Sequence, residues 1–339
     1  ERYGRLDRKR VLQPAIDLAA EGFVLDRDLA GQFTRRQEVF SKYPASAAVF
    51  SKSGELYKAG DLFVQTDLAN TLRRIQKDGK AGFYAGATAD LLVAEMQRGG
   101  GLISHEDLLG YRSSWREPIR GTYRGHEIVS MPPPSSGGIL LVQMLNMLEP
   151  YDISAMGYGS AESIHLMIEA ERRAYADRAQ HLGDADFYPV PIGQLISKTY
   201  AQQRFSDFDP AQASISADIG AGSIPYESPE TTHASVMDAE GNAVAYTTTL
   251  NLSYGAKMVV TGAGFLLNNE MDDFSAKEDS PNAFGLIGRK ANAIEPGKRM
   301  LSSMTPTIVR KEGKPLLVTG SPGGSTIITT TLQVAMNVI

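Results

Sequence analysis

Three segments of the sequence alternate apolar and polar residues on both sides of a short turn, and this pattern predicts three β-hairpins. They occupy residues 116–131, around a glycine, and 233–248 and 305–320, around the turns "DAEGN" and "KEGK". Most of the first two hundred residues instead repeat apolar side chains at helical spacing, for example over 11–22, 65–79 and 161–183. Helices followed by hairpins predict a layered α/β or α+β protein rather than a doubly wound parallel sheet.

Composition and spacing exclude several classes of function. The 339 residues include no cysteine, which rules out disulfides and cysteine-bound zinc. The net charge of -5 gives no bias towards nucleic acid, and no apolar run reaches the ~20 residues that cross a membrane. None of the five histidines has zinc-ligand spacing, and Glu270, Asp272 and Asp273 lack the spacing of a calcium loop. We therefore expect no metal and no cofactor.

The chain begins without methionine and stops inside an apolar helical pattern, so we expect it to be a portion of a longer protein.

A glycine-rich loop, "TGSPGGST" (319–326), lies between the strand pattern "PLLVTG" and a helical pattern. Backbone N–H groups at such a helix start favour negative charge, so the loop could form an oxyanion hole for acyl transfer. It lacks the Walker and dinucleotide-binding glycine patterns. A tight turn that needs glycine's backbone freedom is the other interpretation of the same residues.

Thr231 follows a stretch rich in Pro, Ser, Gly and Ala (207–230), which we interpret as a surface linker, and it begins a strand pattern. A threonine hydroxyl is a weak nucleophile and needs a base. If the peptide bond before Thr231 is cut, the freed α-amine, with a reference pKa of about 8, can serve as that base. The alternative is that Thr231 and Thr232 are ordinary β-branched strand residues.

The sequence resembles the γ-glutamyltransferase (γ-glutamyltranspeptidase) family over nearly all of its length. The similar segments are "TTHASVMDAEGNAVAYTTTLN", "GFLLNNEMDDFSAK", "LSSMTPTI" and "TGSPGGSTIITT", together with the earlier "SMPPPSSGG" and "EAERRAYADRAQHLGD". The resemblance implies an N-terminal-nucleophile hydrolase with a four-layer αββα sandwich and no cofactor.

The resemblance also implies a precursor that cuts itself between Glu230 and Thr231. Residues 1–230 would then belong to the large subunit and 231–339 to the small one, together forming one catalytic domain. The partners implied are the two subunits themselves as a heterodimer, a γ-glutamyl donor such as glutathione, and an amino acid, a peptide or water as acceptor. The family also implies a periplasmic or extracellular location.

Residue roles carried over from the family divide into two sets. For catalysis the resemblance assigns Thr231 as nucleophile, Thr249 as its hydrogen-bonded support, and Gly323 and Gly324 as oxyanion donors. For binding of the substrate's α-amino group it assigns three acceptors, Asn251, Glu270 and Asp273. For binding of the α-carboxylate it assigns the hydroxyls of Ser302 and Ser303.

Some residues depart from the family pattern or receive structural interpretations. Phe284 stands where many bacterial members have tyrosine, and the arginine that pairs with the α-carboxylate in the family lies before this chain begins. His233, next to the expected nucleophile, is interpreted as structural. We interpret "RRAYADRAQ" (172–180) as a solvated helix face with local ion pairs, and "PPPSSGG" (132–138) as a shaped loop near the site.

Three hypotheses therefore follow from the sequence. The first is a γ-glutamyltransferase and glutathione hydrolase. The second is a related acylase acting on glutaryl-type side chains, which has less use for the ammonium acceptors at positions 251, 270 and 273. The third is an unprocessed, non-catalytic relative.

Overall fold

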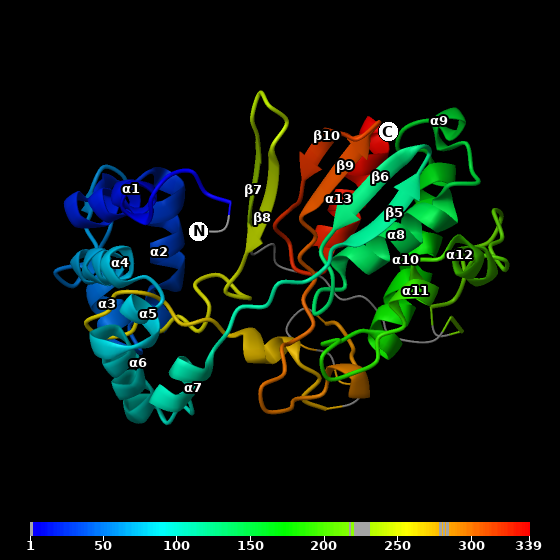
Figure 1. The fold of residues 1–339 in the computed structure, drawn as a ribbon. Coiled ribbons are helices and arrows are strands. Elements are labelled where there is room, and N and C mark those ends of the chain that lie inside the picture. Colours follow the sequence, from blue (N-terminus) through cyan, green and yellow to red (C-terminus); the bar gives the residue numbers. More distant parts are fainter. Residues whose placement is uncertain (1–2, 217, 220–230, 278–279, 281, 283–284) are drawn as a thin grey trace. The chain divides into compact units, whose positions relative to one another are not determined.

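The computed structural model describes residues 3–216, 218–219, 231–277, 280, 282 and 285–339, and within them it forms two compact units (Figure 1). Unit 1 comprises Glu1–Ser114 and Tyr254–Asn268, and unit 2 comprises Trp115–Ser253 and Asn269–Ile339. Glu230 and Phe284, which carry the expected cleavage site and the departure from the family pattern, lie outside the described residues. The large and small subunits stay a prediction, because a backbone cut need not coincide with a boundary between compact units.

Unit 1 is mostly helical. Its elements are α1 (Arg8–Glu21), β1 (Phe23–Val24), α2 (Arg27–Phe40), α3 (Pro44–Phe50), β2 (Ser51–Lys52), β3 (Glu55–Leu56), β4 (Leu62–Phe63), α4 (Thr66–Asp78), α5 (Ala81–Tyr84), α6 (Gly86–Gly99) and α7 (His105–Gly110). Helix α7 begins with a capping box, since the side chains of Ser104 and Asp107 each accept from the other's backbone N–H.

A segment distant in sequence, Tyr254–Asn268, completes unit 1. Tyr254 packs among aromatic rings of α2 and α3, with ring centroids 5.4 Å from Phe40 and 5.6 Å from Phe50. Buried Ser46 fixes the segment further, because its hydroxyl donates to the Lys257 carbonyl (2.8 Å) and accepts from the Val259 N–H (2.9 Å). The chain therefore leaves and re-enters unit 1 through contacts that no local pattern encodes.

Unit 2 contains the three hairpins that the sequence predicts. Its elements are β5 (Ile119–Tyr123), β6 (His126–Ser130), α8 (Gly137–Leu148), α9 (Ile153–Met156), α10 (Ala161–His181), α11 (Ile192–Leu195), α12 (Lys198–Arg204), β7 (Thr232–Met237), β8 (Ala243–Thr248), the 3₁₀-helices η1 (Glu270–Asp273) and η2 (Lys290–Asn292), β9 (Thr307–Lys311), β10 (Lys314–Thr319) and α13 (Thr326–Val338). Strands β10, β9, β6 and β5 form one antiparallel sheet in that order, and β7 pairs with β8 in a separate ribbon that contacts β9 and β10.

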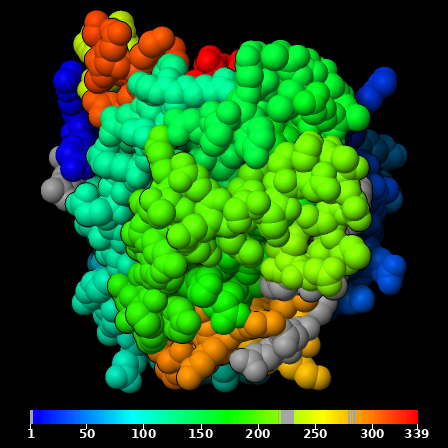
Figure 2. Space-filling model, turned by 90° about the vertical axis from the view of Figure 1, so that its right-hand side faces the viewer, coloured from blue at the N-terminus to red at the C-terminus, as the bar shows by residue number. Residues whose placement is uncertain are grey.

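The core of unit 2 lies between the four-stranded sheet and the helices. Every residue of α8 is buried, and α8 contacts β5 and β6 as well as α10, α12 and α13. On the face that Figure 2 shows, the segments that follow α8, coloured green, cover much of the surface. The mixed α/β architecture that the sequence predicts is thus confirmed. None of the helices within the described ranges is long and apolar enough to cross a membrane.

The interpretation of residues 172–180 as a solvated helix face is wrong. They form the C-terminal half of α10, where Arg173, Asp177 and Arg178 are each at most 5% exposed. The side chains are buried because α10 packs on α8, and their charges are compensated inside the fold. Arg173, for example, binds Glu169 at 2.6 Å and Asp207 at 2.7 Å.

Candidate active site

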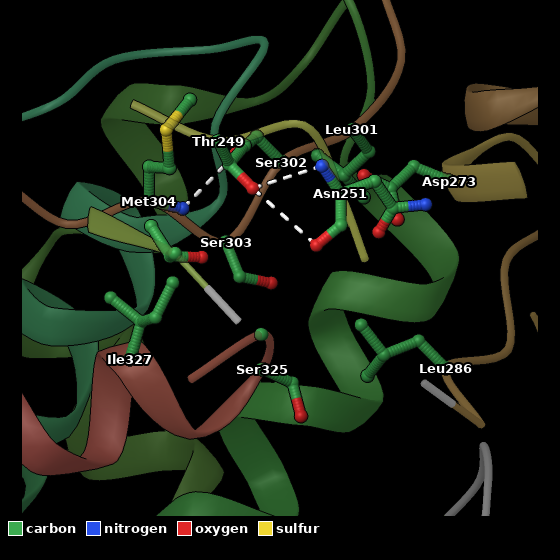
Figure 3. A pocket seen from close by; sticks show the side chains of 12 residues that line it. Thr249, Asn251, Asp273, Leu286, Leu301, Ser302, Ser303, Met304, Ser325 and Ile327 are labelled. Atoms are coloured by element: carbon green, nitrogen blue, oxygen red, sulfur yellow. Dashed lines mark hydrogen bonds between the residues drawn. The ribbon is translucent and has the colours of Figure 1, made fainter. Parts of the chain in front are cut away.

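One cleft of unit 2 gathers most of the residues that the sequence analysis assigns to a site (Figure 3). It encloses about 320 Å³, part of it open to solvent. Seven of the expected residues line it, namely Thr231, Thr249, Asn251, Asp273, Ser302, Ser303 and Gly324. Its other lining residues are Leu286, Leu301, Met304, Ser325 and Ile327. The two remaining expected residues, Glu270 and Gly323, each lie within three residues of a lining residue along the chain.

Thr231 directly precedes β7, and Thr249 directly follows β8, the partner strand in the same ribbon. In this ribbon Thr232 pairs with Thr248, and Met237 pairs with Ala243. Continuing the register by one residue places Thr249 directly opposite Thr231, where cross-strand neighbours are closest. The hairpin therefore brings the expected nucleophile and its expected support to the same end of the ribbon.

His233 has both ring nitrogens engaged in hydrogen bonds. Nδ1 lies 2.8 Å from the Thr247 hydroxyl and Nε2 lies 2.9 Å from the Ser235 hydroxyl. The ring also packs against Gly320, where an added Cβ would lie 2.4 Å from the imidazole. Burial lowers the pKa of His233, which favours the neutral imidazole. These contacts agree with the structural interpretation of this histidine.

The glycine-rich loop joins β10 to α13, as its sequence context predicts. Gly323 has φ 131° and Gly324 has φ 53°, both in the range that side chains other than glycine rarely adopt. A Cβ on Gly323 would lie 2.6 Å from the Thr326 hydroxyl, so space and backbone conformation both require glycine there. The first turn of α13 begins at Thr326, and its N–H groups add a partial positive charge beside the cleft.

Asn251 lines the cleft and carries a buried side-chain oxygen. Its backbone is left-handed (φ 73°), its side chain is 2% exposed, and its N–H donates to Thr249 Oγ1 at 3.0 Å. The side-chain Nδ2 donates to the Asn269 carbonyl at 3.0 Å, which fixes the amide orientation. The opposite atom, Oδ1, has no hydrogen-bond partner within the described part of the chain. A buried amide oxygen in this state costs roughly 1–3 kcal/mol unless a ligand donates to it.

Two carboxyl groups stand at the ends of η1. Burial raises the pKa of Glu270 to about 7, and the nearby Asp273 contributes to the rise. Burial also raises the pKa of Asp273 to about 7, opposed in part by the positive charge of Arg178. A bound cation would offset this desolvation and favour both ionised forms.

The "PPPSSGG" loop holds the segment that carries Ser302 and Ser303. The Ser136 N–H donates to the Ser302 carbonyl at 2.9 Å, and the Ser302 N–H donates to the Pro134 carbonyl at 2.8 Å. Gly137 permits this contact, because a Cβ there would lie 2.5 Å from the Met304 carbonyl oxygen. The loop therefore positions the two serines, which explains its place near the site.

Arg178 of α10 is a functional candidate that the sequence analysis missed. Its side chain is 4% exposed, and it donates from Nε to Ser136 Oγ (3.0 Å) and from Nη2 to Ser303 Oγ (3.3 Å). A usable signal was present, since Ala174 and Ala179 flank this part of the helix. Small residues on a helix indicate that another element packs closely against it.

The described residues contain no group of three or more His, Asp or Glu side chains that could hold a metal ion.

Two solved enzymes share the fold that builds this cleft. Cephalosporin acylase from Bacillus halodurans superposes with a TM-score of 0.82 at 25% identity, covering 99% of this chain and 59% of that one. The γ-glutamyltranspeptidase of Helicobacter pylori superposes with a TM-score of 0.63 at 45% identity, covering 64% of this chain and 62% of that one. The fold is thus of the N-terminal-nucleophile hydrolase class, and the expected fold class is confirmed.

Sequence similarity narrows this class to one family. The family described as gamma-glutamyltranspeptidase matches residues 1–339. The glutathione hydrolase proenzyme of Escherichia coli (strain K12) is 50% identical over 341 residues, which cover 100% of this chain and 59% of that protein. The chain belongs to the γ-glutamyltranspeptidase family, as its motifs indicate, and spans about three fifths of the length of this relative.

Proposed function

We propose that the protein hydrolyses γ-glutamyl compounds such as glutathione and transfers their γ-glutamyl group to an amino acid or peptide, through an ester on Thr231. The observation that carries this proposal is the buried, unpartnered Oδ1 of Asn251, a residue that lines the cleft together with Asp273. An amino acid's ammonium has three N–H donors and needs acceptors of this kind.

The cleft offers complementary groups for each end of a γ-glutamyl donor. The α-ammonium would bind Asn251 Oδ1 together with Asp273 and Glu270, whose ionised forms it stabilises. The α-carboxylate would accept from the Ser302 and Ser303 hydroxyls. The γ-carbonyl would then lie between Thr231 and the glycine-rich loop.

The proposed reaction has two half-reactions. The Thr231 hydroxyl attacks the γ-carbonyl and gives its proton to its own α-amine, while N–H groups of Gly323 and Gly324 stabilise the oxyanion. The tetrahedral intermediate collapses, the C–N bond breaks, and the leaving amine takes the proton. Water or an acceptor amine then attacks the ester in the same way, which restores the Thr231 hydroxyl. Thr249, opposite in the ribbon, would hold the nucleophile in place.

This chemistry requires a free α-amine on Thr231, so we also propose self-cleavage after Glu230 and a heterodimer of the two resulting subunits. The E. coli relative carries the word proenzyme in its name, which agrees with processing. A periplasmic or extracellular location is part of the same proposal.

A glutaryl acylase is the second candidate, favoured by the superposition on cephalosporin acylase over 99% of this chain. A glutaryl group has the same carboxylate but no ammonium. The unpartnered Asn251 oxygen and the two carboxyls would then lack the cation that they suit, so the γ-glutamyl group is the better match.

Intact mass of the full-length protein before and after incubation tests processing. We expect two fragments separated at Glu230–Thr231, no cleavage in Thr231→Ala, and normal cleavage in the control Thr232→Ala, whose side chain is exposed. A persistent single chain would favour the unprocessed, non-catalytic relative.

Turnover of γ-glutamyl and glutaryl anilides by the processed protein then separates the two enzymes. We expect a higher kcat/KM for the γ-glutamyl anilide. A preference for the glutaryl anilide would establish the acylase instead, and activity surviving in Thr231→Ala would refute the assigned nucleophile.

A further inference from the structure

Arg178 connects three segments that are far apart in the sequence. Its side chain leaves the buried face of α10 and reaches Ser136 of the "PPPSSGG" loop and Ser303 of the cleft. Neither α10 nor this loop contributes a lining residue to the cleft, so Arg178 acts on it through Ser303.

We infer that Arg178 is a positioning residue for the α-carboxylate of the donor. Its hydrogen bond to Ser303 directs the hydroxyl proton of that serine into the cleft, and its positive charge lies next to the same hydroxyl. The inference rests on the proposed function and deepens it, because it identifies the source of positive charge for the carboxylate within this chain.

The direction of each hydrogen bond supports this assignment. A guanidinium only donates, so the hydroxyls of Ser136 and Ser303 must both accept from Arg178. The Ser136 proton is used elsewhere, since this hydroxyl donates to the Ser302 carbonyl at 2.8 Å. The Ser303 hydroxyl makes no second hydrogen bond within the described ranges, and its oxygen lines the cleft. Its proton is therefore available to a carboxylate.

The charge of Arg178 adds to this effect. The guanidinium is buried, so water screens it little, and its positive charge opposes the rise in the pKa of Asp273, which lines the cleft. An anion hydrogen-bonded to Ser303 would stand one hydroxyl group away from this charge. The anion would thus gain a hydrogen bond from the Ser303 hydroxyl and an electrostatic attraction to Arg178.

A purely structural role is the competing explanation, because Arg178 also ties the "PPPSSGG" loop to the rest of the site. The two explanations differ in their dependence on the substrate. Loss of a carboxylate-positioning residue harms only donors that carry the carboxylate, whereas distortion of the cleft harms every donor.

Three anilide donors separate these explanations in the full-length, processed protein. The γ-glutamyl anilide has both α-groups, the glutaryl anilide has only the carboxylate, and the 4-aminobutyryl anilide has only the ammonium. In Arg178→Met we expect kcat/KM to fall about 10- to 100-fold for the first two, mainly through KM, the range typical of a hydrogen bond to a charged group. For the 4-aminobutyryl donor we expect a change within about twofold.

Two further variants sharpen the comparison. Arg178→Lys keeps the positive charge but lacks the planar guanidinium, so it should restore part of the kcat/KM lost in Arg178→Met. If Arg178→Met fails to fold or to be processed, the ratio of kcat/KM between donors in Arg178→Lys tests the inference instead. Arg172→Met is the matched control, because Arg172 lies on the same helix but donates to Ser214 and Ser216 and should leave the donor ratio unchanged.

The outcomes distinguish this inference from the proposed function. If the unaltered protein turns over γ-glutamyl and 4-aminobutyryl donors equally well, the carboxylate is not recognised and the proposed function fails. If the unaltered protein prefers the γ-glutamyl donor and the Arg178 variants lose activity equally on all three donors, or keep the preference, only the role of Arg178 is overturned.

Discussion

Replacing Asp273 by asparagine is expected to stabilise the unliganded protein increasingly as the pH rises from 5 to 8. The carboxyl is half-buried beside the cleft, and partial desolvation raises its pKa from 3.8 to about 7. Asparagine has nearly the same shape and keeps an acceptor for Asn282, whose Nδ2 lies 3.4 Å from Asp273 Oδ1. The substitution therefore removes the cost of ionising a half-buried group and little else.

The sign and size follow from linkage. Below the unfolded pKa the carboxyl is protonated in both states and has no effect on the free energy of unfolding. As the pH rises towards 7 the unfolded chain releases the proton while the folded protein retains it, so stability falls. The pKa rises from 3.8 to about 7 on folding, and at about 1.4 kcal/mol per pKa unit this lowers the free energy of unfolding by roughly 4 kcal/mol in total. Roughly 3 kcal/mol of this loss develops between pH 5 and pH 8.

Thermal unfolding of the processed protein at several pH values measures this difference. We expect the Tm of Asp273→Asn to exceed that of the unaltered protein by several degrees at pH 8 and by much less at pH 5. Glu240→Gln, in the exposed turn of the β7–β8 hairpin, is the charge-matched control and should show no such trend. If the Tm values of Asp273→Asn and of the unaltered protein differed by the same amount at every pH, ionisation of Asp273 would not destabilise the folded protein and the reasoning would be wrong.

Three more predictions address the scaffold. Arg173→Met should lower the free energy of unfolding by about 1.5–3 kcal/mol in a urea titration, because the buried Glu169 carboxylate loses its hydrogen-bonded cation at 2.6 Å and keeps the longer contact with Arg172 at 3.6 Å. Gly323→Ala should destabilise the protein by about 1–3 kcal/mol in thermal unfolding and reduce kcat, since the new Cβ meets Thr326 and strains the glycine-rich loop. Ser46→Ala should cost about 1–3 kcal/mol, measured by hydrogen exchange in unit 1, because two backbone groups lose their buried partner.

The hairpins could be predicted from sequence because their information is local. In 233–248 the alternation and the turn "DAEGN" together fix the register, which continued by one residue beyond the Thr232–Thr248 pair would set Thr249 opposite Thr231. The glycine-rich loop was predictable for the same reason, since its strand, loop and helix are consecutive. The residues alone left an oxyanion hole and a tight turn as alternatives for this loop, and the family resemblance favours the oxyanion hole, which stays a prediction.

Other features depend on contacts that no local pattern contains. Asn251 was assigned as an acceptor by resemblance, but its left-handed backbone and unpartnered oxygen required the structure. Arg178 was expected to be solvated because charged residues at helical spacing usually face water. Its burial follows from the packing of α10 against α8, elements whose contact is not encoded in either segment alone.

The position of α10 bears on how the proposed heterodimer would keep its site intact. Tyr175 donates its hydroxyl proton to the Ser325 carbonyl of the glycine-rich loop, and Arg178 donates to Ser303. Residues three apart lie on the same face of a helix, separated by about 4.5 Å along its axis. One face of α10 thus supports both the loop proposed to stabilise the oxyanion and the serine proposed to bind the α-carboxylate. Because α10 precedes the proposed cut and both of its targets follow it, cleavage would leave the two ends of the substrate site held by a single helix of the other subunit.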